Sequence, residues 1–179
     1  MQSALARCAR GESSAFATIV QEHQAMVFSI ALHYLRDRSL AEDLGQEVFL
    51  ELYQKVAGIQ SADHLTYWLR RVTVNRCIDQ GRRKKHRRET ALEDSPEPAT
   101  ATAQADPLLF GRLEESLATL PEKQRMVVIL RYQEGMGLAE IAEMLAMPLN
   151  TVKSTLHRTL EELRKKLTRK LREVRYAIF

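Results

Sequence analysis

Apolar side chains recur at intervals of three and four residues through most of the chain, which is the spacing of an amphipathic helix. The sequence shows no sustained alternation of apolar and polar residues and no Asn-Gly hairpin turn, so strands are not expected. Four helices are predicted before residue 89, beginning near Ser3, Ser13, Ser39 and Asp63. Amphipathic helices with short connections predict an all-α fold that starts with a compact bundle.

The composition changes sharply after Arg88. Residues 89–105 contain two prolines with many Ala, Thr and acidic residues, and almost no large apolar side chain. Such a segment cannot bury enough surface to offset its ordering entropy, so we predict a flexible linker. Asp106 and Pro107 restart helical structure, because Asp is a good N-cap and Pro suits the first helical position. The prediction is two small helical domains, residues 1–88 and 106–179, joined by this linker.

Residues 136–171 have the pattern of a helix-turn-helix. An apolar stripe from Leu138 to Leu145 is followed by Pro148, which cannot donate a backbone hydrogen bond to a continuing helix. Asn150 is a preferred N-cap, so a second helix is expected to begin at Thr151. Its apolar positions predict an inward face, and its early outward positions are polar or basic: Thr151, Lys153, Ser154, His157 and Arg158. Such a helix start can enter the major groove of DNA, and the alternative is a solvated surface helix.

Charge is distributed unevenly along the chain. The 179 residues carry a formal net charge of only +4. Acidic residues concentrate at 42–51, and basic residues concentrate at 82–88 and 153–175. This segregation suggests separate surfaces for different partners.

A dense cation cluster occupies residues 79–88, which read Asp-Gln-Gly-Arg-Arg-Lys-Lys-His-Arg-Arg. Such a cluster binds a polyanion by releasing counterions and carries no sequence information by itself. Just before it, aromatic, amide and basic side chains suit unpaired bases, which stack and hydrogen-bond through exposed edges: Tyr67, Trp68, Asn75 and Arg76. For Trp68 alone, an ordinary core position is the favoured interpretation.

Acidic and amide side chains share one face of the predicted third helix, opposite its Leu44, Val48 and Leu52 stripe. They are Glu42, Asp43, Gln46, Glu47 and Glu51. This face could dock a basic protein surface, although a plain solvated face is the usual outcome for such charges. Acid–base catalysis or metal binding is disfavoured, because catalytic groups sit in pockets and this face is expected to be open to solvent.

The sequence does not support a disulfide-bonded or zinc protein, a secreted or membrane protein, or an enzyme. Its two cysteines, Cys8 and Cys77, lack CxxC or paired histidine spacing, which argues against disulfides and structural zinc. Residues 1–12 have no apolar core like that of a signal peptide, and no apolar run approaches the roughly 20 residues that cross a bilayer. We therefore expect a soluble cytoplasmic protein without membrane insertion. No catalytic spacing, metal motif or phosphate loop is found, so no enzyme activity, cofactor, metal or small-molecule substrate is expected.

Taken in order, these features resemble an extracytoplasmic-function (ECF) sigma factor of bacterial RNA polymerase. The resemblance spans about residues 11–167. It is carried by four segments: Ala41–Leu50 (AEDLGQEVFL), Trp68-Leu69 with Val74-Asn75, Leu120–Arg125 (LPEKQR) and Thr151–Ser154 (TVKS). The fold and function that it implies are those of a two-domain transcription initiation factor.

The resemblance assigns residues 1–88 to sigma domain two and residues 106–179 to sigma domain four. It implies that the protein binds RNA polymerase core and directs it to promoter DNA. Three positions match those that bind the core: Asp43, Gln46 and Glu47. The next helix would recognise and melt the minus-ten element, with five residues at its DNA: Asn75, Arg76, Asp79, Arg82 and Arg83. The second helix of the helix-turn-helix would read the minus-thirty-five element as duplex, through Thr151, Lys153, Ser154, His157 and Arg158.

Three positions depart from the family's pattern. Gly45 stands at a helical position that the family fills with a larger residue, at a cost of about 0.5–1 kcal/mol relative to Ala. Asn150 replaces a frequent Gly, and Thr155 replaces a frequent Arg, which removes one expected DNA contact.

Two other interpretations compete with the resemblance. A two-domain regulator could bind operator DNA without polymerase, although the sequence lacks the apolar pattern of a dimer interface or ligand pocket. An enzyme could use Cys77 or His33, although isolated residues of these types on helices are usually structural. The sequence leaves open the promoter, the inducing signal and whether an anti-sigma factor is a partner.

Overall fold

The structure, a computed structural model, describes residues 2–90 and 115–177, and every regular element in those ranges is a helix. The all-α prediction is therefore confirmed. The chain divides into two compact units, residues 1–99 and 100–179. The linker predicted over residues 89–105 lies outside the described residues from position 91 onward, as does the helix start predicted at Asp106.

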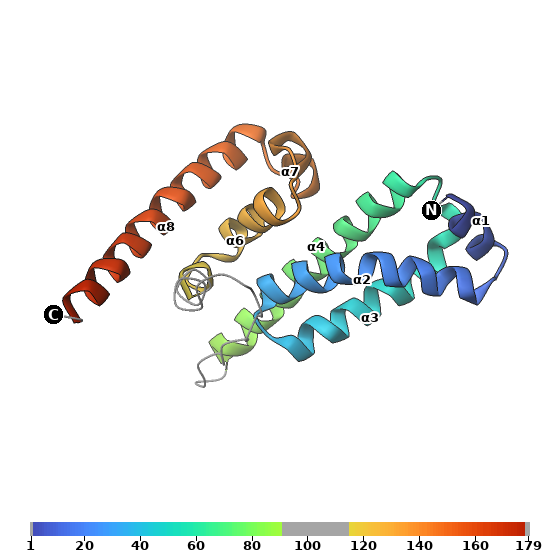
Figure 1. Ribbon diagram of the computed structural model, residues 1–179, viewed down its shortest axis with the longest axis horizontal. Helices are drawn as coiled ribbons and strands as arrows, with labels where there is room; N and C mark the ends of the chain where they lie inside the picture. The colour runs from blue at the N-terminus through green and yellow to red at the C-terminus, as the bar shows by residue number, and fades with distance from the viewer. Residues whose placement is uncertain (1, 91–114, 178–179) are drawn as a thin grey trace. The chain divides into compact units, whose positions relative to one another are not determined.

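The first unit contains four α-helices and a short 3-10 turn (Figure 1). They are α1 (Gln2–Ala9), α2 (Ser13–Leu35), α3 (Arg38–Lys55), η1 (Val56–Gly58) and α4 (Ala62–Thr90). Helices α2, α3 and α4 pack against one another, and α1 packs on α2 and η1. Each of the three long helices buries one apolar stripe in the shared core, which includes Ile19, Val27, Ile30, Leu44, Val48, Leu52, Leu65, Leu69 and Val74.

The caps of α3 and α4 precede the residues that the sequence pattern suggested. Arg36 ends α2 in the left-handed conformation, with φ of 56°, and donates its backbone N–H to the Leu32 carbonyl. The chain reverses there, so Asp37 becomes the first cap available to α3, and its carboxylate accepts the Leu40 N–H at 3.1 Å. Ser61 caps α4 by accepting the N–H of His64 at 3.1 Å. The predicted starts at Ser39 and Asp63 are therefore late.

The second unit contains a helix-turn-helix supported by an earlier helix (Figure 1). A helical turn at residues 115–118 precedes α6 (Glu122–Val128), the π-helical turn η2 (Ile129–Gln133), α7 (Leu138–Met144) and α8 (Leu149–Ala177). Helix α8 packs on both α6 and α7. The shared core is apolar and includes Met126, Val127, Leu130, Ile141, Met144, Val152, Leu156 and Leu163.

The turn between α7 and α8 uses backbone groups as caps. Ala146 adopts a left-handed conformation with φ of 49°, and the Met147 N–H donates to the Ala142 carbonyl at 2.9 Å, which closes α7. The Pro148 carbonyl then accepts the N–H groups of Thr151 and Val152. Helix α8 therefore begins at Leu149, directly after Pro148. The predicted N-cap role of Asn150 is wrong, because Asn150 lies inside the first turn of the helix.

Arg125, the last residue of the LPEKQR segment, is a structural cap. Its guanidinium donates to the carbonyl oxygens of Leu117, Ala118 and Leu120, at 3.3, 2.8 and 3.0 Å. These carbonyls lie at or just after the end of the preceding helical turn, where the regular backbone hydrogen bonds stop; that of Leu117 also accepts the Leu120 N–H at 3.1 Å. Lys166 of α8 also reaches this turn and donates to Thr119 Oγ1 at 2.7 Å. The two cations tie the start of the unit to α6 and α8.

Gly45 lies mid-helix in α3, where a methyl group would meet only Val27 Cγ1, at an ordinary contact distance of 3.9 Å. We expect Gly45→Ala to stabilise the first unit by about 0.5–1 kcal/mol, because alanine loses less backbone entropy in a helix. Trp68, the only tryptophan, lies on α4 and reports unfolding of this unit by fluorescence. Gly11→Ala is the control and should destabilise by about 1–2 kcal/mol, because Gly11 has a φ of +89°. A lower melting temperature for Gly45→Ala would contradict the packing described.

His23 of α2 is buried, and its Nε2 lies 3.5 Å from Thr66 Oγ1 on α4. Burial is the main cause that lowers the pKa of His23; the nearby Arg70 also lowers it, and Glu22 opposes the shift. The imidazole of His23 therefore binds a proton more tightly in the unfolded chain than in the folded unit. The contribution of the uncharged His23 to the free energy of unfolding is fully present above the unfolded pKa of about 6.5. It decreases as the pH falls below that value.

We therefore expect the melting temperature followed by Trp68 fluorescence to fall between pH 7.5 and 5.5, and to fall less steeply in His23→Gln. The glutamine cannot take up the proton, so the comparison concerns the slope and not the absolute stability. His157→Gln is the control and should leave this slope unchanged, because His157 lies in the second unit and Trp68 reports the unfolding of the first. Equal slopes in the wild type and His23→Gln would rule out the buried imidazole as the cause.

Candidate nucleic-acid and protein interfaces

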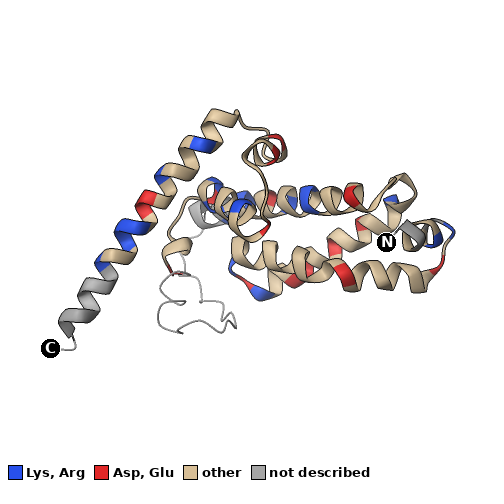
Figure 2. Ribbon diagram, turned by 45° about the horizontal axis from the view of Figure 1, so that its top comes forward, with Lys and Arg blue, Asp and Glu red and all other residues tan. Residues whose placement is uncertain are grey.

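The outer face of α3 is acidic: Glu42, Asp43 and Glu47 are exposed, and Figure 2 marks the acidic residues of the ribbon in red. Asp43, Gln46 and Glu47 are all exposed there, whereas Leu44, Val48 and Leu52 on the opposite face are buried. The structure thus places the three residues predicted to bind the core polymerase on one accessible surface. We call this surface, residues 42–54 excluding the buried stripe, the α3 outer face.

Two large apolar side chains on the α3 outer face were missed by the sequence analysis. Leu50 is 61% exposed and Tyr53 is 56% exposed, and Tyr53 is held edge-on to Phe16 of α2, with 5.1 Å between ring centroids. Exposed apolar groups beside charged ones are typical of protein interfaces. The signal was present in the sequence, because Leu50 and Tyr53 fall off the Leu44, Val48 and Leu52 stripe.

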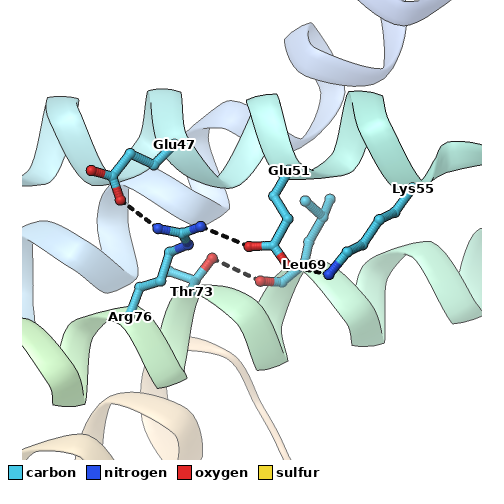
Figure 3. A network of polar contacts seen from close by, with 6 residues as sticks. All are labelled: Glu47, Glu51, Lys55, Leu69, Thr73 and Arg76. Atoms are coloured by element: carbon cyan, nitrogen blue, oxygen red, sulfur yellow. Dashed lines mark hydrogen bonds and ion pairs between the residues drawn. The ribbon is translucent and has the colours of Figure 1, made fainter.

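Arg76 of α4 lies between two carboxylates of α3 (Figure 3). Its Nη1 pairs with Glu47, and its Nη2 donates to Glu51 Oε2 at 2.7 Å. Lys55 Nζ pairs with the other oxygen of Glu51 at 2.7 Å. Hydrogen bonds from Lys55 and Arg76 hold the pKa of Glu51 below its ordinary value. Residues predicted for two different partners, Glu47 and Arg76, are therefore brought together in one cluster.

The remaining residues predicted to contact the minus-ten element form a stripe on α4. Asn75, Asp79, Arg82 and Arg83 are all exposed and lie at helical spacing, with the Arg82 Nη1 atom 3.8 Å from the Asp79 Oδ1 atom. Arg71 is exposed one turn earlier on the same side. The side chains of residues 85–88, the end of the cation cluster, lie outside the described residues. We call the five exposed residues Arg71, Asn75, Asp79, Arg82 and Arg83 the α4 stripe.

Aromatic residues near the start of the α4 stripe are half-buried. Trp68 and Tyr67 each keep part of the side chain accessible. The core position favoured for Trp68 is therefore only partly correct, because Leu65 and Leu69 fill the fully buried positions of this turn. A half-buried ring is held in place by the core and still presents an edge or face to solvent.

The exposed face of α8 carries the residues predicted to read duplex DNA. Thr151, Lys153, His157 and Arg158 are exposed, while Val152 and Leu156 are buried against the rest of the unit. Ser154 is half-buried, and its hydroxyl donates to the Thr151 carbonyl at 3.1 Å, so its oxygen remains an acceptor. The structure therefore brings all five residues to the first turns of one helix.

Glu161 interrupts the basic character of this face. It is exposed one turn after His157 and Arg158, and the basic residues Arg164 and Lys165 follow it. Figure 2 shows one red stretch between the blue segments of α8. A carboxylate repels DNA phosphates, so close contact with DNA is favoured for the part of α8 that precedes Glu161.

Neither cysteine presents a reactive thiol in the structure. Cys77 is fully buried in α4, and burial raises its pKa to about 12; burial also raises the pKa of Cys8. Within residues 2–90 and 115–177, no three His, Cys, Asp or Glu side chains gather as metal ligands. None of the helices in those ranges combines the length and apolar character needed to span a membrane.

Comparison with known proteins assigns both units. Family models of sigma-70 region 2 and sigma-70 region 4 match residues 19–88 and 110–163. The RNA polymerase sigma-E factor of Streptomyces antibioticus is 34% identical over 159 residues, which cover 89% of this chain and 88% of that protein. The ECF RNA polymerase sigma factor SigW of Bacillus subtilis is 29% identical over 175 residues, covering 88% of this chain and 91% of that protein.

Comparison of folds agrees with this assignment. The sigma factor RpoE of Bartonella quintana, solved in complex with the anti-sigma factor NepR, matches with a TM-score of 0.74. The sequence identity is 21%, and the match covers 86% of this chain and 96% of that chain. The chain therefore belongs to the ECF group of the sigma-70 family, the transcription initiation factors that bind RNA polymerase core and direct it to promoters.

Proposed function

We propose that the three exposed surfaces divide the work of promoter recognition among them. The α3 outer face docks RNA polymerase core, the α4 stripe contacts the opened minus-ten element, and the first turns of α8 read the minus-thirty-five duplex. The observation that carries this proposal is the placement of the predicted residues, which are accessible on three separate helix faces opposite buried apolar stripes.

Core docking is supported by the composition of the α3 outer face. Asp43 and Glu47 supply negative charge, and Leu50 supplies exposed apolar area beside them. Charge complementarity steers a basic partner toward such a surface, and burial of apolar groups then contributes most of the affinity. We therefore add Leu50 and Tyr53 to Asp43, Gln46 and Glu47 as residues proposed to bind the core.

DNA opening in this proposal needs no catalytic group. The α4 stripe has only to bind the unpaired strand better than the duplex, because a ligand shifts an equilibrium by its differential affinity. Arg82 and Arg83 suit phosphates, Asn75 suits base edges, and half-buried Trp68 and Tyr67 offer stacking surfaces nearby. We propose that the chain is not an enzyme and that it acts in the cytoplasm with the polymerase.

An anti-sigma factor is a further proposed partner. The Bartonella quintana relative was solved with one bound, and CnrH, which shares this fold with a TM-score of 0.64, was solved with the cytosolic domain of CnrY. The exposed Leu50 and Tyr53 side chains offer such a partner an apolar contact on the same face that we propose for the core.

The proposed function is tested by transcription from a random promoter library with purified core polymerase and the full chain. We expect the holoenzyme to select promoters that core alone does not. The proposal would be contradicted if the holoenzyme produced the same transcripts as core polymerase without the chain. An operator-binding regulator would also fail to co-purify with core in stoichiometric amounts.

We expect Asp43→Ala combined with Leu50→Ala to weaken binding to core polymerase at least tenfold, because both a charge and an apolar contact are lost. Competition against a labelled wild-type chain measures the change. Glu22→Ala removes an exposed carboxylate from α2 and should alter the affinity less than twofold. The affinity of the isolated chain for DNA should be nearly intact in every variant. Undiminished core affinity in the folded double variant would place the docking surface elsewhere.

We expect Lys153→Ala or Arg158→Ala to weaken holoenzyme binding to the minus-thirty-five duplex by about 1–3 kcal/mol where the side chain reads a base. If the side chain binds a phosphate instead, its loss should lower the affinity for all DNA sequences alike. The slope of the logarithm of affinity against the logarithm of salt concentration should then decrease by about 1. Arg164→Ala, about 16 Å further along α8 than Lys153, is the control and should have a small effect. Unchanged binding in both variants would show that another face of α8 enters the groove.

A further inference from the structure

The Arg76 cluster joins the α3 outer face to the helix that carries the α4 stripe. Glu47 and Glu51 stand one turn apart on α3, and the guanidinium of Arg76 reaches each of them with a different nitrogen (Figure 3). Two ion pairs between α3 and α4 therefore meet at this one side chain. A change at Glu47 acts directly on a side chain of α4.

The two carboxylates hold Arg76 unequally. Glu51 is 22% exposed, and Lys55 fixes its second oxygen, so this carboxylate is held in place. Glu47 is 60% exposed and lies on the surface proposed for polymerase docking. A cation on a docking partner can reach Glu47, whereas Glu51 is largely covered. The pair between Glu47 and Arg76 is thus the one open to exchange.

Arg76 itself is incompletely satisfied where it lies. Its side chain is 34% exposed, and its Nε is buried without a hydrogen-bond partner in the part of the chain that the structure describes. An arginine normally uses its parallel N–H groups in a two-bond fork, but each carboxylate here takes one terminal nitrogen. An ion pair as exposed as that with Glu47 contributes little to stability, so its exchange costs little.

The position of Arg76 on α4 places it beside the DNA contacts proposed for this helix. It follows Asn75 directly and precedes Asp79 by three residues and Arg83 by seven, so these residues share adjoining rows of the helix. A long, flexible side chain released from Glu47 can therefore turn toward a phosphate bound at the α4 stripe.

We propose that the pair between Glu47 and Arg76 couples docking on α3 to DNA binding on α4. A basic partner surface on Glu47 frees the Nη1 side of the Arg76 guanidinium, which then contacts the minus-ten strand while Nη2 stays paired with Glu51. The inference rests on the proposed function of the two surfaces. In the free chain Arg76 is neutralised by its carboxylates, and in the holoenzyme it is a DNA contact. By linkage, bound DNA that holds Arg76 strengthens docking by the same factor.

The test compares Arg76→Gln with Arg83→Gln in two states, the free full chain and the holoenzyme. The probe is a fluorescent single-stranded oligonucleotide with the non-template minus-ten sequence of a promoter selected from the random library. We expect Arg76→Gln to change the affinity of the free chain less than twofold and to weaken the holoenzyme at least fivefold. Arg83→Gln, at an exposed position on the same helix, should weaken both states by similar factors.

A second variant removes the exposed carboxylate of Glu47 and leaves the buried apolar residues of the unit unchanged. Glu47→Gln should raise the affinity of the free chain for the same oligonucleotide about threefold. It should also steepen the salt dependence by up to about 0.7, the value for one additional phosphate contact on a single strand. Glu42→Gln is the matched control, because Glu42 is exposed on α3 and pairs with Arg38 instead of Arg76. In an Arg76→Gln background, Glu47→Gln should have no more effect than Glu42→Gln.

Several outcomes would overturn the coupling. Equal losses for Arg76→Gln in both states would make Arg76 an ordinary DNA contact, and no loss in either state would make it only a tie between helices. Equal gains for Glu47→Gln and Glu42→Gln would reduce the effect to net charge. Failure of the proposed function looks different, because the wild-type chain would then fail to bind core, or its holoenzyme would bind the oligonucleotide no better than core alone.

Discussion

Burial of one apolar stripe on each of α2, α3 and α4 is the interaction on which the surfaces of the first unit depend. Removing Val27, Val48 and Leu69 from water is favourable only when each helix turns its stripe inward, and this sets the rotation of each helix about its own axis. Once that rotation is set, the acidic residues of α3 and the polar residues of α4 must face outward. The functional faces are thus a consequence of the core.

The same constraint acts in the second unit with fewer residues. Val152 and Leu156 anchor the start of α8 against the rest of the unit, and this leaves Lys153, His157 and Arg158 on the outside. The turn before α8 needs the left-handed Ala146 and the Pro148 carbonyl to aim that start correctly. A helix that reads DNA must project a few side chains accurately, and a rigid turn makes this possible.

Burial of the apolar stripes makes all of these outer helix faces accessible to solvent, and their charges then distinguish one face from another. The α3 outer face is acidic and repels DNA, whereas the α4 stripe and the start of α8 carry the cations. Arg76 stands at the boundary of the first two surfaces, with its charge balanced by Glu47 and Glu51. A protein that binds both polymerase and DNA with small domains gains from such a division, because each partner finds one complementary surface.

The hydrophobic pattern by itself determined the all-α fold and the exposure of Asp43, Gln46 and Lys153, because helical periodicity is a local property and a helix must bury its apolar stripe. Tertiary structure alone decided the partners of Arg76, which lie 29 and 25 residues away, and the capping of three carbonyls by Arg125. These contacts depend on which helices lie side by side and where the chain turns, and no local spacing of residues encodes that.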